Sequence, residues 1–165
     1  VCKPEHKRYT LIYDDLSSKL DSRIQYINLI RPDEALCREL RLEPQQWIVS
    51  IQRTLRGDSR TEICDQIYLP YRKGMPLVET EIKYAEFPDL VKNKVSEFSV
   101  YTRMEIGVEE VRGEIAHRLD VPEGCRLMVI CRYLVDRNDC TMAYGKQYLH
   151  PECGRIVAYS TNSEL

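Results

Sequence analysis

The sequence predicts an α+β fold, in which one antiparallel sheet carries helices packed on one side. Most apolar segments alternate with a period of two, as half-buried strands do, and only a few short stretches follow a helical period. The same order of strand, helix, strand, turn and strand also occurs twice along the chain. Neither half alone could bury both its helix and its sheet face. We therefore expect the halves to share one sheet, as an internally pseudo-duplicated domain.

The first half contains four predicted strands and one helix. Alternating apolar residues predict strands over 9–16 and 23–30. A helix is expected over 32–42, because a proline opens it and two acidic residues occupy its first turn, where the helix dipole favours negative charge. A strand over 46–55, a turn and a returning strand over 61–70 then form a predicted hairpin.

The second half repeats this order after a turn-rich segment, in which only a short helix around 88–92 is predicted. A strand over 98–106 precedes an amphipathic helix, a Pro-Glu-Gly turn and an apolar strand within 114–136, and a returning strand begins at 145. The halves align without a gap as far as the second long strand. The offset is 79 residues, and it pairs Ile27 with Ile106, Leu40 with Leu119, Ile51 with Ile130, Arg53 with Arg132 and Leu55 with Leu134.

Composition and charge indicate a single globular domain. A chain of 165 residues is long enough for one domain that buries roughly two thirds of its unfolded surface. The 24 basic and 26 acidic residues are interleaved and give a net charge of −2, which argues against this chain gripping nucleic acid by itself. No apolar run approaches the ~18 residues of a membrane-spanning helix, so we expect a soluble, cytoplasmic protein. Because the first residue is valine, we expect a fragment of a longer protein.

The cysteines and histidines predict neither a cofactor nor a metal site. The seven cysteines are odd in number and include no CxxC pair, which favours reduced thiols over a disulfide framework. The three histidines carry no accompanying signature of a zinc site or of a nucleophile pair. We therefore expect no cofactor, no metal ligand and no catalytic residue.

Two arginines lie on predicted apolar strand faces. Side-chain alternation places Arg53 on the same face as Ile51, and Arg132 on the same face as Ile130. A guanidinium keeps its proton in such surroundings and is costly there unless it meets an anion with good hydrogen-bond geometry. The anion is either an internal carboxylate or a bound ligand.

Hairpin pairing predicts a partner for each arginine. If the first hairpin pairs symmetrically about its turn, Asp65 lies opposite Arg53 in a cross-strand ion pair. The same pairing of the second hairpin places Tyr144, and no carboxylate, opposite Arg132, with Tyr148 on the same face. A tyrosine hydroxyl beside an arginine suits a small carboxylate or phosphate. The predicted ligand-binding residues are therefore Arg53, Asp65, Arg132, Tyr144 and Tyr148. A purely structural polar network is the alternative.

Four segments carry a family resemblance: ALCRELRLEPQQWIVSIQR at 35–53, DQIYLP at 65–70, FPDL at 87–90 and AHRLDVPEGCRLMVICRYLVD at 116–136. Together they resemble the UTRA domain, the effector-binding domain of the HutC branch of GntR-type bacterial transcription regulators. The resemblance spans residues 8–160 as one domain. It implies the fold of chorismate lyase, a homodimer without enzymatic activity, and a small effector. That effector would change operator binding through an N-terminal winged helix-turn-helix absent from this chain.

The resemblance also implies roles for individual residues. The family's pocket arginine matches Arg53, its acidic residue three positions before Tyr-Leu-Pro matches Asp65, and late pocket residues fall near Tyr144 and Tyr148. Members that bind sugar phosphates usually carry a second arginine where this chain has Leu55. A small carboxylate or amino-acid-like effector therefore fits better than a sugar phosphate. Two alternatives stay open: a lyase acting on an aromatic carboxylate, with Asp65 as its candidate proton-transfer group, and a dimerisation module without a ligand.

Overall fold

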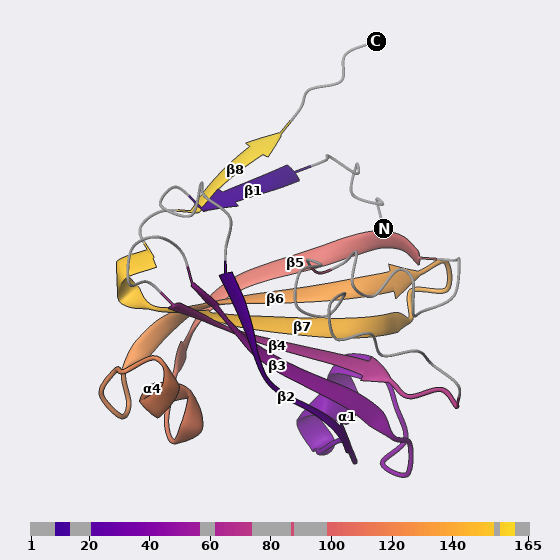
Figure 1. Ribbon diagram of the computed structural model, residues 1–165. Coiled ribbons are helices and arrows are strands. Elements are labelled where there is room, and N and C mark those ends of the chain that lie inside the picture. The colour runs from indigo at the N-terminus through magenta and orange to yellow at the C-terminus, as the bar shows by residue number, and fades with distance from the viewer. Residues whose placement is uncertain are drawn as a thin grey trace.

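The main element of the fold is a six-stranded antiparallel sheet (Figure 1). The computed structural model describes residues 9–13, 21–56, 62–73, 87, 99–153 and 156–160 of the 165-residue chain. In spatial order the strands are β2 (Asp21–Ile30), β3 (Ile48–Arg56), β4 (Glu62–Pro70), β7 (Thr141–Leu149), β6 (Arg126–Asp136) and β5 (Ser99–Glu110). Each neighbouring pair runs antiparallel, which confirms the predicted sheet.

A separate two-stranded sheet joins segments from the two ends of the chain. β1 (Tyr9–Tyr13) pairs antiparallel with β8 (Ile156–Ser160), and Tyr9 lies opposite Ser160. β1 falls within the strand predicted over 9–16, whereas the sequence pattern did not indicate β8. The pairing brings residues near both ends of the chain side by side.

The first helix, α1 (Glu34–Leu40), begins later than the sequence pattern predicts. Asp33 has an extended backbone, and its side chain accepts a hydrogen bond from the Leu36 backbone N–H at 2.8 Å. Asp33 is therefore the N-cap, a position that aspartate fills well because it satisfies an otherwise free N–H of the first turn. The prediction that Pro32 opens the helix is wrong for this reason.

The second helix, α4 (Glu114–Arg118), occupies the corresponding place before β6. It follows Gly113, which has a φ of 60° and donates its backbone N–H to the Glu123 carboxylate at 2.9 and 3.0 Å. A short 3₁₀ turn, η1 (Pro151–Cys153), follows β7. In Figure 1, α1 and α4 lie below the large sheet and the β1–β8 pair lies above it.

The two faces of the large sheet bury different side chains. We call the face that carries Ile51 and Arg53 the arginine face, and the opposite face the helix face. On the helix face, Leu40 of α1 packs in a cluster with Ile48, Tyr133, Val135 and Tyr144. A second cluster contains Cys64, Val111, Ala116, Leu119 and Leu127 and includes the buried side of α4. Each fully buried leucine or isoleucine contributes about 1.5–3 kcal/mol, so these clusters hold both helices against the sheet.

The arginine face carries the apolar cluster with the most fully buried residues among those described. This cluster consists of Val49, Ile51, Ile67, Leu69, Phe87, Leu134, Met142 and Ala143. It joins the central strands of both halves with Phe87, which lies in the segment between β4 and β5. The helix predicted around 88–92 and the turn of the first hairpin lie outside the described residues.

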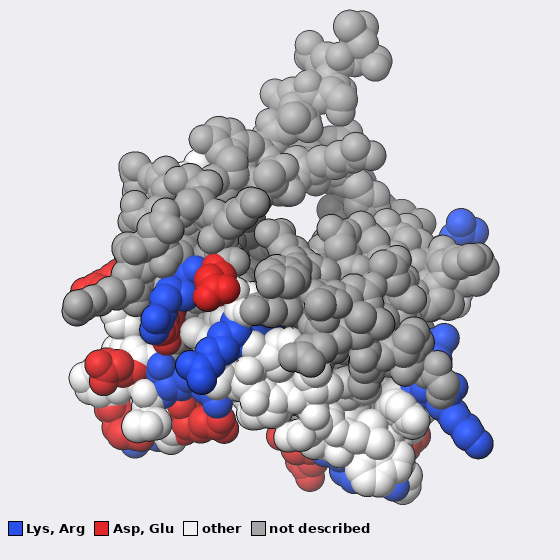
Figure 2. Space-filling view, in the orientation of Figure 1, with Lys and Arg blue, Asp and Glu red and all other residues white. Residues whose placement is uncertain are grey.

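Part of the described surface carries charges of both signs. Figure 2 shows acidic and basic side chains intermixed around the α4 end of the molecule in this view. None of the helices in the described ranges combines the length and the hydrophobicity that crossing a bilayer requires.

Candidate functional site

The centre of the arginine face carries a buried ion pair. Arg53 of β3 lies directly opposite Asp65 of β4, which confirms the predicted register of the first hairpin. Arg53 Nε donates to Asp65 Oδ2 at 2.7 Å, and the two side chains are 3% and 0% exposed. Because both charges are removed from water, each depends on the other for compensation.

The second arginine reaches the same carboxylate from β6. Arg132 Nη2 donates to Asp65 Oδ1 at 3.1 Å, and Nη1 donates to the Phe87 backbone carbonyl at 3.3 Å. The Arg132 side chain is 11% exposed. Asp65 therefore holds one arginine on each of its oxygens, and the expectation that no carboxylate serves Arg132 is wrong.

The tyrosine predicted to face Arg132 lies elsewhere, because the second hairpin contains a β-bulge. Close to the turn, Val135 pairs with Thr141, as symmetric pairing predicts. The next pair is Leu134 with Ala143, which leaves Met142 without a partner on β6. A shift of one residue moves every later side chain of a strand to the other face of the sheet.

Because of the bulge, the β7 residues beyond it lie on the opposite face of the sheet from the one predicted. Gly145 lies opposite Arg132 on the arginine face, whereas Tyr144 lies opposite Tyr133 on the helix face. Tyr148, four residues further along β7, shares the helix face with Tyr144. The predicted contact of Tyr144 and Tyr148 with the arginines is therefore wrong.

The two tyrosines take part in the packing of the helix face. The Tyr144 ring centre lies 5.1 Å from that of Tyr133, and its hydroxyl lies 3.3 Å from Cys131 Sγ. Tyr148 packs at the α4 cluster, with the Lys146 Nζ 5.1 Å from its ring centre. Burial raises the pKa of Tyr144 and of Tyr148 above the ordinary value, so both phenols stay protonated at neutral pH.

Two residues that the sequence argument did not assign lie beside the arginines. Gln147 is 3% exposed and pairs with Asp65 across β4 and β7, so it shares the arginine face. The Phe87 ring centre lies 5.0 Å from the Arg132 guanidinium carbon, and the ring lies 3.3 Å from the position of a Cβ on Gly145. With the bulge included, side-chain alternation along β7 would have placed Gln147 on the arginine face. Phe87 belongs to the FPDL segment, one of the four segments that carry the family resemblance.

Among the described residues, the cluster combines two arginines with one carboxylate. Arg53 and Arg132 share the Asp65 carboxylate, and Arg132 Nε is buried without a hydrogen-bond partner among the described residues. A buried donor of this kind is costly unless an acceptor approaches it. The geometry therefore suits the binding of a small anion, because a planar guanidinium offers paired donors that match a carboxylate or phosphate.

The described residues of the cluster offer little for proton transfer or metal binding. Both Asp65 oxygens accept hydrogen bonds from arginine, so this carboxylate is not poised as a free base. Burial raises the pKa of Cys64 to about 11, which keeps this thiol protonated near neutral pH. Within the described ranges, no group of three or more His, Cys, Asp or Glu side chains could hold a metal ion.

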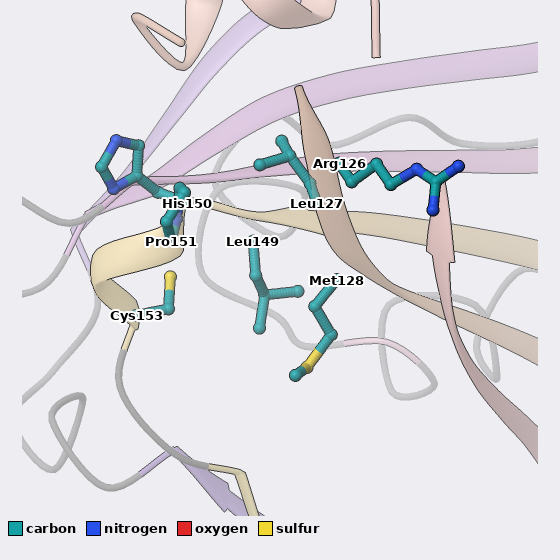
Figure 3. Close-up of a pocket in the computed structure, with 7 residues that line it drawn as sticks. All are labelled: Arg126, Leu127, Met128, Leu149, His150, Pro151 and Cys153. Carbon is teal, nitrogen blue, oxygen red and sulfur yellow. The ribbon is translucent and has the colours of Figure 1, made fainter. Parts of the chain in front are cut away.

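A separate pocket of about 130 Å³ lies where β6 and β7 meet η1 (Figure 3). Its lining residues are Arg126, Leu127, Met128, Leu149, His150, Pro151 and Cys153. Figure 3 shows the Arg126 and His150 side chains extending to opposite sides of the view. This volume is below the ~300–1,000 Å³ of ordinary small-molecule sites, and none of the clustered arginines lines the pocket. The arginine cluster is therefore the stronger candidate.

Comparisons with known proteins agree on one family model and one fold. The model of the UTRA domain matches residues 16–153. The effector-binding domain of the Bacillus subtilis trehalose repressor is similar with a TM-score of 0.69 at 18% identity, covering 87% of this chain and 99% of that one. A GntR-family transcriptional regulator from Enterococcus faecalis is similar with a TM-score of 0.66 at 16% identity, covering 81% of this chain and 96% of that one. A GntR-family transcriptional regulator from Bacillus cereus is similar with a TM-score of 0.67 at 17% identity, covering 82% of this chain and 94% of that one. No curated protein sequence matches the chain.

Proposed function

Because the chain belongs to the UTRA domain family, we propose that it is the effector-sensing and dimerisation domain of a GntR-type bacterial transcription regulator. The similar solved structures include GntR-family regulators and the effector-binding domain of a repressor. In this proposal the chain binds a small anionic metabolite and passes the signal to a separate winged helix-turn-helix. That domain would contact the operator in the cytoplasm, so this chain itself would not touch DNA.

The observation that carries the proposal is the sharing of one carboxylate by two buried arginines. Asp65 accepts a hydrogen bond from each arginine, and Arg132 Nε is buried without a hydrogen-bond partner among the described residues. An anion bound beside Arg132 would accept a hydrogen bond from this donor. Gln147 and Phe87 lie next to the arginines and would contact such a ligand from β7 and from the segment after β4.

The proposed effector is a small carboxylate or an amino-acid-like molecule, with a sugar phosphate as the less favoured class. A phosphate needs several strong donors, whereas Leu55 stands where sugar-phosphate-binding members usually carry a further arginine. Tyr144 and Tyr148 lie on the helix face and are no longer part of the proposed site. The proposed ligand-binding residues are Arg53, Asp65 and Arg132.

The proposal is tested by thermal unfolding of the chain in the presence of small carboxylates, amino acids and sugar phosphates. A ligand at 100 times its dissociation constant adds about 2.7 kcal/mol, which for a domain of this size raises the unfolding temperature by roughly 5–10 °C. We expect one of these classes to produce such a shift. Failure of every class to do so would contradict the sensor function and favour a dimerisation module without a ligand.

Two variants locate the ligand once a compound is found. Arg132→Met keeps most of the side-chain volume but removes the charge, so we expect the thermal shift to disappear. Arg56→Met is the matched control, because Arg56 lies on the same strand as Arg53 but is 62% exposed. A folded Arg132→Met variant that binds the compound as well as the unchanged chain would exclude the arginine face as the site.

We also propose that the domain is an internal duplication. Support comes from the strand order, which is mirrored about the β4–β7 pair, where Gln66 lies opposite Lys146. Arg41 and Asp120, which are 79 residues apart, follow α1 and α4 with φ angles of 50° and 52°. Three backbone hydrogen bonds also recur at this offset. In the first half the backbone N–H groups of Arg41, Leu42 and Gln46 donate to the carbonyls of Arg38, Cys37 and Glu43. In the second half the corresponding N–H groups of Asp120, Val121 and Cys125 donate to the carbonyls of His117, Ala116 and Pro122.

The proposed duplication explains the asymmetry of the site. Arg53 and Arg132 correspond, and their cross-strand neighbours Asp65 and Gly145 correspond as well. The second half therefore has a glycine where the first half has its carboxylate. Arg132 compensates by reaching Asp65 across the boundary between the halves.

A further inference from the structure

An exposed row of side chains crosses the ends of three neighbouring strands. Arg31 directly follows β2, Trp47 directly precedes β3 and Tyr71 directly follows β4. The Arg31 guanidinium carbon lies 3.9 Å from the centre of the Trp47 ring, and the Tyr71 backbone N–H donates to the Trp47 carbonyl at 2.8 Å. Leu29, two residues before Arg31 on β2, extends the row. We call these four residues the tryptophan row.

The apolar members of the tryptophan row are exposed, although they are residue types that proteins usually bury. Leu29, Trp47 and Tyr71 are 47%, 42% and 39% exposed, whereas the next residues toward the centre of β3 and β4 on the same face, Val49 and Leu69, are 1% and 0% exposed. Tryptophan, tyrosine and arginine are also the residue types that contribute most to binding energy in protein interfaces. A contiguous exposed group of this composition indicates a surface that binds another protein.

The charges beside the tryptophan row are positive. Arg72 and Lys73 continue the chain from the β4 side of the row and are exposed, and neither they nor Arg31 form an ion pair with any described residue. Asp33, the carboxylate closest to Arg31 in sequence, accepts the capping hydrogen bond at the start of α1. Three cations beside two aromatic rings suit a partner that carries carboxylates next to an apolar side chain.

We propose that the tryptophan row is a docking surface for an acidic segment of another protein. A carboxylate of this segment pairs with Arg31, and an apolar side chain packs on the rings of Trp47 and Tyr71. Stacking occupies the face of the Arg31 guanidinium and leaves the N–H donors in its plane for the carboxylate. Nucleic acids also bind to aromatic and cationic side chains, but they draw on many phosphate contacts. Three cations on a chain of net charge −2 favour a short acidic segment instead.

The tryptophan row is separate from the arginine cluster that is proposed to bind the effector. Trp47 and Arg53 are six residues apart, which corresponds to roughly 20 Å along an extended strand. A docked segment and a bound effector therefore contact different residues. For this reason the docking surface and the effector site can be tested independently, and either proposal can fail without the other.

The proposal is tested with a random peptide library displayed on phage and selected on the 165-residue chain, with the double variant Arg31→Ala/Trp47→Ala as the counter-selection. We expect the enriched peptides to carry Asp or Glu beside an apolar residue. An enriched peptide that lacks tryptophan is then titrated onto the chain. Because Trp47 is the single tryptophan of the chain, its fluorescence reports on this surface directly. Added salt should weaken the binding, since the pairing is exposed to solvent.

Single variants measure each contact by the anisotropy of a labelled peptide. Trp47→Ala should weaken binding at least about 30-fold, as truncation of an interface hot spot does, and Arg31→Ala about tenfold. Arg103→Ala is the matched control, because Arg103 is 51% exposed and its guanidinium carbon lies 4.1 Å from the centre of another ring, that of Tyr133. It should leave the affinity unchanged. Circular dichroism verifies that every variant is folded.

Three results would overturn the proposal. The first is a selection that enriches no acidic peptide. The second is an enriched acidic peptide that binds the folded double variant as tightly as the unchanged chain. The third is a change of Trp47 fluorescence with anionic lipid vesicles or single-stranded DNA but not with the acidic peptide, which would assign the row to a membrane or a nucleic acid.

Discussion

Among the described residues, Asp65 is the carboxylate that the two arginines of the arginine face share. Its side chain is fully buried, and each of its oxygens accepts a hydrogen bond from a different arginine. Removing one partner of a buried ion pair is costly, because the other charge remains in an apolar environment without compensation. The three side chains therefore act as one unit, and their substitutions should not be additive.

The shared carboxylate predicts an order of stability among variants. Asp65→Ala should lower the free energy of unfolding by ~3–5 kcal/mol, because it removes the buried carboxylate to which both arginines donate. Arg53→Met should cost less, because Asp65 Oδ1 still accepts a hydrogen bond from Arg132 at 3.1 Å. Urea denaturation followed by circular dichroism measures both losses. If Arg53→Met destabilised the chain as much as Asp65→Ala, the compensation by Arg132 would be refuted.

The sequence predicts one arginine partner correctly and the other wrongly, for a physical reason. Symmetric pairing places Asp65 opposite Arg53, and the structure agrees, because β3 and β4 form a regular ladder. The same rule fails for Arg132, because the unpaired Met142 shifts β7 by one residue. A bulge depends on how the hairpin packs against the rest of the sheet, and the alternation of apolar residues does not reveal it. The contact of Arg132 with Asp65 is equally invisible, because it joins strands that are distant in sequence.

At the scale of elements, the helices are short and depend on their ends. α1 has seven residues and α4 has five, so neither would be stable as an isolated peptide. Their stability comes from packing on the sheet and from the hydrogen bonds that cap them. The sequence located both helices because their apolar residues recur at helical spacing. It placed the beginning of α1 too early, because proline and aspartate are both common at a helix start.

The N-cap of α1 offers a test at this scale. Asp33→Ala removes the acceptor for the Leu36 N–H and should lower the free energy of unfolding by about 1 kcal/mol, within the ~0.5–2 kcal/mol range of such caps. Asp33→Ser keeps an acceptor at the same place and serves as the control, with a loss of at most a few tenths of a kcal/mol expected. Chemical denaturation of the two variants compares them. Equal losses would mean that the capping hydrogen bond contributes nothing measurable.

At the scale of the molecule, the described residues combine charges of both signs around α4 with two buried arginines that share one carboxylate. The net charge is −2, and Figure 2 shows charges of both signs intermixed around α4. Arg53 and Arg132 lie inside the fold, where a small anion but not a nucleic acid backbone can approach them. Composition alone indicated the first of these properties. The second required the fold, because it depends on which strands lie side by side.

This distribution of charge predicts that the chain alone does not bind operator DNA. Affinity for DNA at physiological salt comes largely from many Lys and Arg contacts to phosphates, and an acidic chain with dispersed basic residues lacks them. A gel-shift or anisotropy titration with the operator of the regulator should therefore show no sequence-specific complex. The proposed full-length regulator, with its separate DNA-binding domain, is the positive control. Specific binding by the 165-residue chain alone would contradict the proposal that a separate domain binds the operator.

The pairing of β4 with β7 has a consequence for the order of folding. Arg53 and Asp65 are 12 positions apart, whereas Asp65 and Arg132 are 67 positions apart, so the centre of the sheet forms only when a long loop closes. The hairpins of each half can assemble from local contacts, and their docking along β4 and β7 should come later. In a pulsed hydrogen-exchange experiment, β4 amides that point to β3 should become protected before those that point to β7. Simultaneous protection would show instead that the two halves fold as one cooperative unit.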